Sequence, residues 1–201
     1  HLSIRRQRQM CIRDRALANE IWVVSDEIYQ NVIYDGKRAY SITEVVPAMK
    51  DLTIMVNGVA KSYAMTGWRL GWMAGPQDAM KAAANLQSHL TSNVNNIAQR
   101  AAIAALTGPQ DEIKAMVDAF DRRRHLAVSE LGKISNWLAP MPEGAFYVYS
   151  DVRGLLGKSW GGKQINTSLE LCDYILDTAE VALVPGEAFG PSGYVLSLIH
   201  I

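Results

Sequence analysis

The sequence predicts an α/β fold that is followed by a smaller α+β section. Three observations support this fold class. Three short apolar runs lie between residues 21 and 74, as expected of buried strands; the first two end in polar residues and the third in Gly75-Pro76. Helical patterns follow from Asp78 to Leu131. The remaining chain then combines aromatic, β-prone residues with one capped helix, which is typical of an α+β arrangement.

The first strand is predicted over Ile21–Val24, a short continuous apolar run that suggests a strand buried on both faces. Ser25, Asp26 and Glu27 follow it directly. Open α/β sheets bind ligands at the carboxyl ends of their strands. Acidic residues at this position are therefore candidates for a binding site.

A second strand is predicted over Leu52–Val56, and a third over Leu70–Ala74. The polar loop between them contains Lys61, which places a lysine just past a strand end. The dipeptide at residues 57–58, Asn-Gly, is also compatible with a hairpin turn.

Four helices and two strands complete the prediction. The first three helices are expected over residues 78–90, 97–106 and 110–131, the last of them roughly 33 Å long at 1.5 Å per residue. The strands are expected at residues 145–149 and 181–184, and Thr167 and Glu170 match a capping box that opens a further helix between them.

Composition excludes several classes of partner. Twenty basic residues balance twenty acidic ones in the 201-residue chain, so no global field favours nucleic acid or an anionic membrane. No apolar run could span a bilayer and no secretion signal is visible. Cys11 and Cys172 lack metal-ligand spacing, so we expect no metal site. These features predict a cytoplasmic protein without membrane or nucleic-acid partners.

The two ends differ from the rest of the chain. Residues 1–15 are rich in arginine, and their apolar residues do not recur at the spacing of a helix or a strand. Residues 196–201 read LSLIHI. We interpret both segments as non-native read-through and exclude them from fold reasoning. A native basic arm that binds nucleic acid is the alternative for the first segment.

Two segments together carry a family resemblance. Residues 25–29, SDEIY, and residues 57–71, NGVAKSYAMTGWRLG, resemble in order and spacing the motif of class I, fold-type I, pyridoxal-phosphate (PLP)-dependent aminotransferases. The resemblance extends from about Ala16 to Val195 and is closest to the bacterial aspartate aminotransferases. It implies a fragment of an aminotransferase, a transferase that moves an amino group between an amino acid and a 2-oxo acid.

The resemblance also implies a division into domains. Residues 16–108 correspond to the later part of the PLP-binding large domain, which has a mostly parallel sheet. Residues 109–131 form a long interdomain helix, and residues 132–195 form a smaller α+β domain. The parent protein is expected to be a homodimer, and aspartate is the first substrate to test.

Four residues acquire roles from the resemblance. Lys61 would bind PLP as a Schiff base and act as a general base. Asp26 would pair with the pyridine nitrogen, because a nearby carboxylate favours its protonated form. Tyr29 would donate to the phenolate oxygen of the cofactor, and Arg69 would hold its phosphate through two parallel hydrogen bonds.

Each of these residues has a simpler interpretation when taken alone. A lone lysine is usually a solvated surface charge, an aspartate after a strand often caps a turn, and an arginine often forms a surface ion pair. For Tyr29, the simpler interpretation is an aromatic ring packed against the sheet.

The sequence departs from the family pattern at several positions. Many relatives have a hydroxyl residue where this chain has Ala60 or Gly58. The glycine-rich phosphate turn, the aromatic that stacks on the cofactor and an asparagine to its phenolate oxygen would all precede this segment. The arginine for the substrate carboxylate is expected after Val195, where the chain has Leu196. We therefore expect that this chain, as written, does not transaminate.

Three alternatives remain open at this point. The same lysine motif serves PLP enzymes that catalyse elimination, ring closure or decarboxylation. An effector domain of a transcription regulator can adopt the aminotransferase fold, and an upstream helix-turn-helix domain would favour that interpretation. A plain α/β domain with a chance motif is the third alternative.

Overall fold

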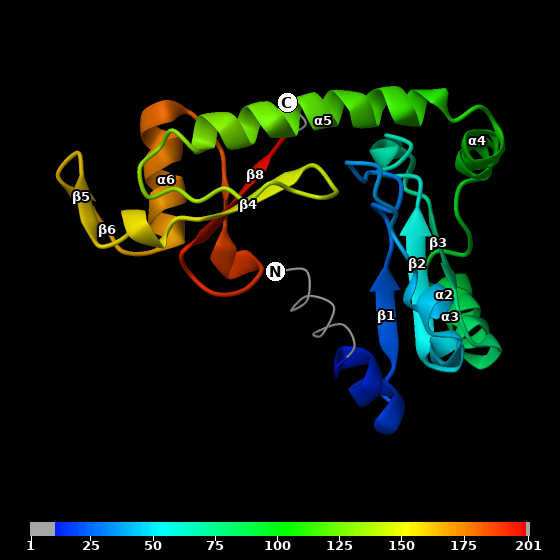
Figure 1. Cartoon of the computed structure of the whole chain (residues 1–201). Coiled ribbons are helices and arrows are strands. Elements are labelled where there is room, and N and C mark those ends of the chain that lie inside the picture. Colours follow the sequence, from blue (N-terminus) through cyan, green and yellow to red (C-terminus); the bar gives the residue numbers. More distant parts are fainter. Residues whose placement is uncertain (1–10, 200–201) are drawn as a thin grey trace. The chain divides into compact units, whose positions relative to one another are not determined.

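The computed structural model describes residues 11–199 and divides into two compact units, the first ending at Ile113 and the second starting at Lys114. The elements of the first unit are β1 Val23–Asp26, α2 Ile42–Val45, β2 Thr53–Gly58, β3 Gly71–Ala74, α3 Gln77–Leu90 and α4 Asn96–Thr107. Those that follow are α5 Asp111–Leu131, β4 Tyr147–Asp151, β5 Lys158–Trp160, β6 Lys163–Ile165, α6 Ser168–Ala179, β7 Val184–Pro185 and β8 Tyr194–Leu198 (Figure 1).

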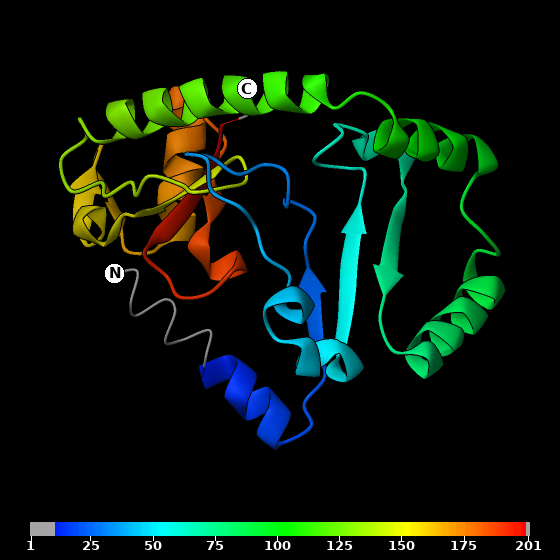
Figure 2. The ribbon, with the colours of Figure 1, turned by 45° about the vertical axis from the view of Figure 1, so that its right-hand side comes forward.

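The sheet of the first unit contains β1, β2 and β3 in that order (Figure 2). β1 and β2 pair in parallel, with Asp26 opposite Val56, as the α/β prediction requires. β3 pairs antiparallel to β2, so the three described strands form a mixed sheet where a mostly parallel one was expected. The connection between β2 and β3 contains only the short 3-10 helix Thr66–Trp68 and turns the chain straight back, whereas parallel neighbours need a longer crossover.

β1 differs in burial from the prediction of a strand covered on both faces. Val24 is 68% exposed, and the adjacent Trp22 is 51% exposed. The physical reason is that β1 forms an edge of the described sheet and its side chains alternate between half-buried and exposed positions. The apolar run at residues 21–24 therefore predicted a strand in this region, but β1 starts two residues later, at Val23, ends at Asp26 and is not covered on both faces.

Helices α3 and α4 confirm the two helices predicted after the third strand. Pro76 precedes the first turn of α3, a position where its missing N–H costs no hydrogen bond. The side chain of Asn95 caps α4 by accepting hydrogen bonds from the amides of Ile97 and Ala98 at 2.8 and 3.2 Å. α4 buries Ala98 and Ala102, whereas α3 contains no fully buried residue.

The long helix predicted over residues 110–131 is α5, which starts at Asp111. The boundary between the two units at Ile113 assigns all but its first three residues to the second unit. Arg124 is fully buried on α5, and its guanidinium donates to the carboxylate of Asp121 and to the carbonyl of Pro142. These bonds tie the helix to the segment that leads into β4.

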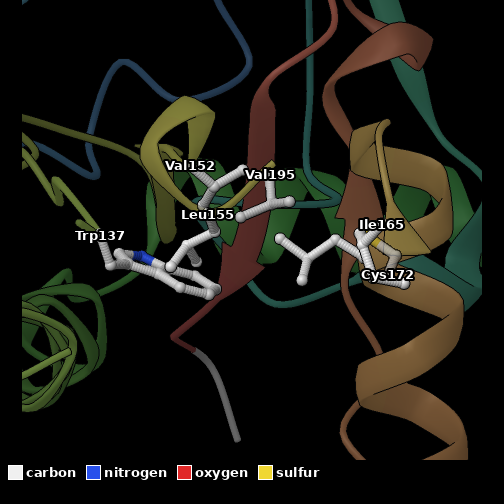
Figure 3. Close-up of a cluster of buried hydrophobic side chains, with 7 residues drawn as sticks. Trp137, Val152, Leu155, Ile165, Cys172 and Val195 are labelled. Carbon is white, nitrogen blue, oxygen red and sulfur yellow. The ribbon is translucent and has the colours of Figure 1, made fainter. Parts of the chain in front are cut away.

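The second unit has its own hydrophobic core, formed by Trp137, Val152, Leu155, Ile165, Leu171, Cys172 and Val195. Figure 3 shows Trp137 beside Leu155, Ile165 beside Cys172, and Val195 reaching this cluster from β8. Helix α6 contributes Leu171 and Cys172 to the cluster. The capping box at its start is confirmed, because Thr167 and Glu170 each accept from the backbone of the other.

The strands of the second unit form a sheet in the order β4, β8, β7, and β5 and β6 form a separate hairpin. β4 lies two residues later than the predicted strand 145–149. β7 is Val184–Pro185, so it contains only Val184 of the strand predicted at 181–184. β8 extends to Leu198 and pairs with β4. Residues 1–10 and 200–201 lie outside the described range, so most of the segments interpreted as non-native carry no structural description here.

Within residues 11–199, no helix is both long enough and apolar enough to cross a membrane.

The two cysteines provide a test of this burial pattern. Burial raises the pKa of the Cys172 thiol to about 11, and the nearby Glu187 and Asp173 add to the shift, whereas Cys11 is exposed. Because the thiolate is the reactive form, we predict that iodoacetamide at neutral pH modifies Cys11 at least about tenfold faster than Cys172. Peptide mass spectrometry measures both rates.

A Cys11→Ser chain serves as the control and should incorporate label only after denaturation. Equal rates at the two cysteines of the native chain would contradict the burial of Cys172.

Candidate active site

The candidate site starts at the carboxyl ends of β1 and β2, which the parallel register brings to the same edge of the sheet. The amide of Glu27 donates to the carbonyl of Val56 at 2.9 Å, so the chain after β1 stays attached to β2. The Asp26 carboxylate is exposed at this edge and accepts a hydrogen bond from the Ile28 amide at 3.1 Å. Asp26 therefore shapes the turn that carries Tyr29.

A cleft of about 460 Å³ opens beside this edge. Its lining includes Asp26, Tyr29, Asn31, Arg38 and Tyr40. The guanidinium of Arg38 lies 4.9 Å from the centre of the Tyr40 ring and pairs with the Glu44 carboxylate. Two of the four predicted site residues, Asp26 and Tyr29, thus line one small-molecule-sized cleft.

Lys61 lies in the connection that follows β2 and is half-buried. Its ammonium nitrogen is 5.9 Å from the centre of the Tyr29 ring, within the range of a cation–π contact. The backbone turns tightly at this point, with the Ala64 amide donating to the Lys61 carbonyl at 3.1 Å. The structure therefore brings together Lys61 and Tyr29, which are 32 residues apart in sequence, although Lys61 is not among the residues that line the cleft.

Arg69 occupies a different position. It ends the short 3-10 helix Thr66–Trp68 in the left-handed conformation, with φ of 51°, and its guanidinium donates to the carbonyl of Thr66 at 3.1 Å. The side chain is exposed and does not line the cleft. The predicted contact of Arg69 with a phosphate remains a prediction.

Sequence reasoning did not select several residues that shape the site. Gly58 and Gly71 face each other at the end of the β2–β3 pair, and a Cβ atom on Gly58 would lie 2.9 Å from the carbonyl oxygen of Leu70. Ser62 is 2% exposed and reaches the carbonyl of Ile28. Arg38 and Tyr40 sit in a loop without a motif. Close backbone approach is a property of paired strands, so the sequence alone gave no signal for it.

The geometry assembles an amine, a phenol and a carboxylate at one edge of a sheet. Such a set can hold a small polar molecule and exchange protons with it. Among residues 11–199, no cluster of three or more histidine, cysteine, aspartate or glutamate side chains is arranged to bind a metal ion. The site thus defines a class of α/β protein in which a lysine that follows one strand lies beside a tyrosine, and an acid ends the neighbouring parallel strand.

The family profile described as "Aminotransferase class I and II" matches residues 7–195. The chain therefore belongs to the class I and II aminotransferases. This match confirms the family suggested by the two motifs and includes all four predicted site residues.

Two relatives of this chain within the family are named aspartate aminotransferases. The chain is 54% identical over 175 residues to the aspartate aminotransferase of Streptomyces avermitilis. The aligned region covers 87% of this chain and 43% of that protein. It is 45% identical to the aspartate aminotransferase of Rhizobium meliloti strain 1021, with the same coverage of both chains. The chain spans less than half the length of these relatives.

Solved structures confirm the fold. The aspartate aminotransferase from Rhizobium meliloti superimposes with a TM-score of 0.87 at 43% identity, covering 91% of this chain and 46% of that one. The aromatic aminotransferase from Pyrococcus horikoshii gives a TM-score of 0.84 at 34% identity, covering 94% and 48%. The α/β fold with a smaller α+β part is therefore that of these aminotransferases.

The close approach at Gly58 yields a prediction. We expect Gly58→Ala to destabilise the first unit by about 1–3 kcal/mol, because the new methyl group would meet the backbone of Leu70 and Gly71, which must shift to admit it. Gly67→Ala is the matched control in the same connection, since a Cβ atom there meets nothing within 4 Å. Its expected effect is within about 0.5 kcal/mol.

Urea unfolding followed by circular dichroism measures both free energies of unfolding. Equal effects of the two substitutions would show that the β2–β3 pair is not packed as described.

Proposed function

We propose that this chain is part of an enzyme that transfers an amino group between an amino acid and a 2-oxo acid, with PLP attached to Lys61. The observation that carries the proposal is the position of the Lys61 amine against the Tyr29 ring, inside the two segments that led to the family. The residues fit this cofactor by their chemistry: an amine for its aldehyde, a carboxylate for its ring nitrogen and a phenol for its ring oxygen.

Lys61 has two tasks in this proposal. Its amine would attach the cofactor and, once displaced by the substrate amine, would move the proton between the substrate α-carbon and the C4′ carbon of the cofactor. The bound cofactor supplies an electron sink for the charge that remains on that carbon. Lys61 is half-buried, and its amine lies 5.9 Å from the centre of the Tyr29 ring.

The other three residues would orient the cofactor. Asp26, at the end of β1, would favour the protonated pyridine nitrogen by charge. The hydroxyl of Tyr29 would donate a hydrogen bond to the ring oxygen of the cofactor. This hydrogen bond would lower the basicity of the nitrogen that is attached to the cofactor. Arg69 would grip the phosphate with two parallel N–H groups. That role requires its guanidinium to leave the Thr66 carbonyl, to which it donates at 3.1 Å.

The finer assignments rest on the relatives. Proteins named aspartate aminotransferase, at 54% and 45% identity, support aspartate as the first amino-acid substrate. We also propose a homodimeric parent protein in the cytoplasm. The relatives and solved structures reported above are named as aminotransferases, so neither a regulator nor an eliminating or decarboxylating enzyme is favoured.

Attachment of the cofactor gives the direct test. Incubation with PLP followed by borohydride reduction should add one phosphopyridoxyl group to the peptide that contains Lys61, as read by mass spectrometry. Lys61→Arg should abolish this adduct, because a guanidinium does not condense with the aldehyde. The control is Lys133→Arg, which changes an exposed lysine paired with Glu130.

The proposal would be wrong if the label were spread evenly over the exposed lysines, or if Lys61→Arg left the pattern unchanged.

A second prediction concerns turnover. Leu196 lies on β8 opposite Tyr149 and Val184, and its side chain offers no donor for a carboxylate. We therefore predict that the chain, supplied with PLP, aspartate and 2-oxoglutarate, forms no glutamate above the rate of free PLP. The Rhizobium meliloti aspartate aminotransferase serves as the active control. Turnover that disappears in Lys61→Ala would contradict this prediction.

A further inference from the structure

Ser62 is the buried neighbour of Lys61 and has no role in the proposed chemistry. Its side chain is 2% exposed, and its hydroxyl donates to the carbonyl of Ile28 at 3.4 Å. Ile28 lies between Asp26 and Tyr29. We propose that Ser62 is a positioning residue that holds the lysine loop against the segment carrying Asp26 and Tyr29. Its importance for catalysis rests on the function proposed above.

The hydrogen bond from Ser62 to Ile28 matters because Ser62 is buried. A hydroxyl without access to water must find its partner within the protein, because an unpaired buried polar group costs about 1–3 kcal/mol. The carbonyl of Ile28 provides that partner for Ser62. The bond is long for an O–H to oxygen contact, so its energy is modest. Its effect is to fix where the loop lies, since it joins segments 34 residues apart.

Three backbone hydrogen bonds of the loop make other connections. The Ala64 amide bonds to the Lys61 carbonyl, and the Met65 amide bonds to the Val59 carbonyl at 3.3 Å, so both close the loop on itself. The Val59 amide bonds to the Leu70 carbonyl and attaches the loop to the start of β3. The Ser62 hydroxyl instead reaches the segment that carries Tyr29.

The position of the lysine is sensitive to this restraint. The Lys61 nitrogen is 5.9 Å from the Tyr29 ring centre, close to the roughly 6 Å limit of a cation–π contact. A small displacement of the loop would therefore separate the amine from the ring. Catalytic groups misplaced by about 1 Å can lose a large part of their rate advantage. Ser62 thus acts through Lys61 and does not need to contact a substrate.

Competitive acylation of lysines tests the proposal on the chain itself, without cofactor. Peptide mass spectrometry gives the labelling rate of Lys61 relative to the exposed Lys81 and Lys133, which report any general change. We expect Ser62→Ala to raise the relative rate of Lys61 roughly two- to tenfold, the population change that follows loss of one net hydrogen bond. Ser62→Thr keeps the hydroxyl and should retain most of the restraint.

A matched control tests whether any buried serine would have this effect. Ser168 is fully buried in the second unit, and its hydroxyl donates to Glu187 at 2.9 Å. Ser168→Ala should leave the relative rate of Lys61 unchanged. Circular dichroism confirms that each variant is folded, and amide exchange of residues 59–65 gives a second measure of loop mobility.

The outcomes separate this proposal from the proposed function. Faster labelling of Lys61 in Ser62→Ala alone supports the positioning role, even if PLP never attaches to Lys61, a result that would overturn only the proposed function. An unchanged rate in folded Ser62→Ala, or an equal rise in Ser62→Ala and Ser62→Thr, overturns the positioning role. That conclusion would hold even if PLP attaches to Lys61.

Discussion

The candidate site depends on the parallel pairing of β1 with β2. Their register, with Asp26 opposite Val56, brings the two carboxyl ends to the same edge of the sheet, and the Glu27 amide extends the pairing by one more hydrogen bond. A shift of one residue would turn each side chain to the other face of the sheet. The acid, the tyrosine and the lysine loop could not then share this edge.

The loop after β2 depends on a second constraint, which is the space between backbones. Gly58 and Gly71 face each other, and the absence of a side chain on Gly58 allows Leu70 and Gly71 to approach. Val59 then bonds to Leu70, and the chain turns back into an antiparallel β3. Within this narrow turn, Lys61 points to Tyr29 while Arg69 adopts a left-handed conformation and bonds to its own loop.

The second unit is held together by different interactions. Its core forms where α6 packs on β8. The Glu187 carboxylate forms hydrogen bonds at the start of α6. Glu187 accepts hydrogen bonds from the amide and the hydroxyl of Ser168 at the start of α6. Burial opposes ionisation of Glu187, but bonds from Ser192 and Ser168 outweigh it and lower the pKa of this carboxyl. The Ser168 hydroxyl also accepts a hydrogen bond from the Gly193 amide, which attaches the loop that leads into β8 to the start of α6.

Local sequence determined much of this protein. Apolar runs, the capping box and the motif around Lys61 predicted the strands, helices and family, because these features depend on side-chain periodicity and on residue chemistry. Tertiary structure decided what periodicity does not encode: the antiparallel course of β3, the exposure of Val24 on an edge strand and the contact between Lys61 and Tyr29. It also decided that Arg69 bonds within its loop and that Ser62 is buried against Ile28. Each of these depends on which segments distant in the sequence become neighbours.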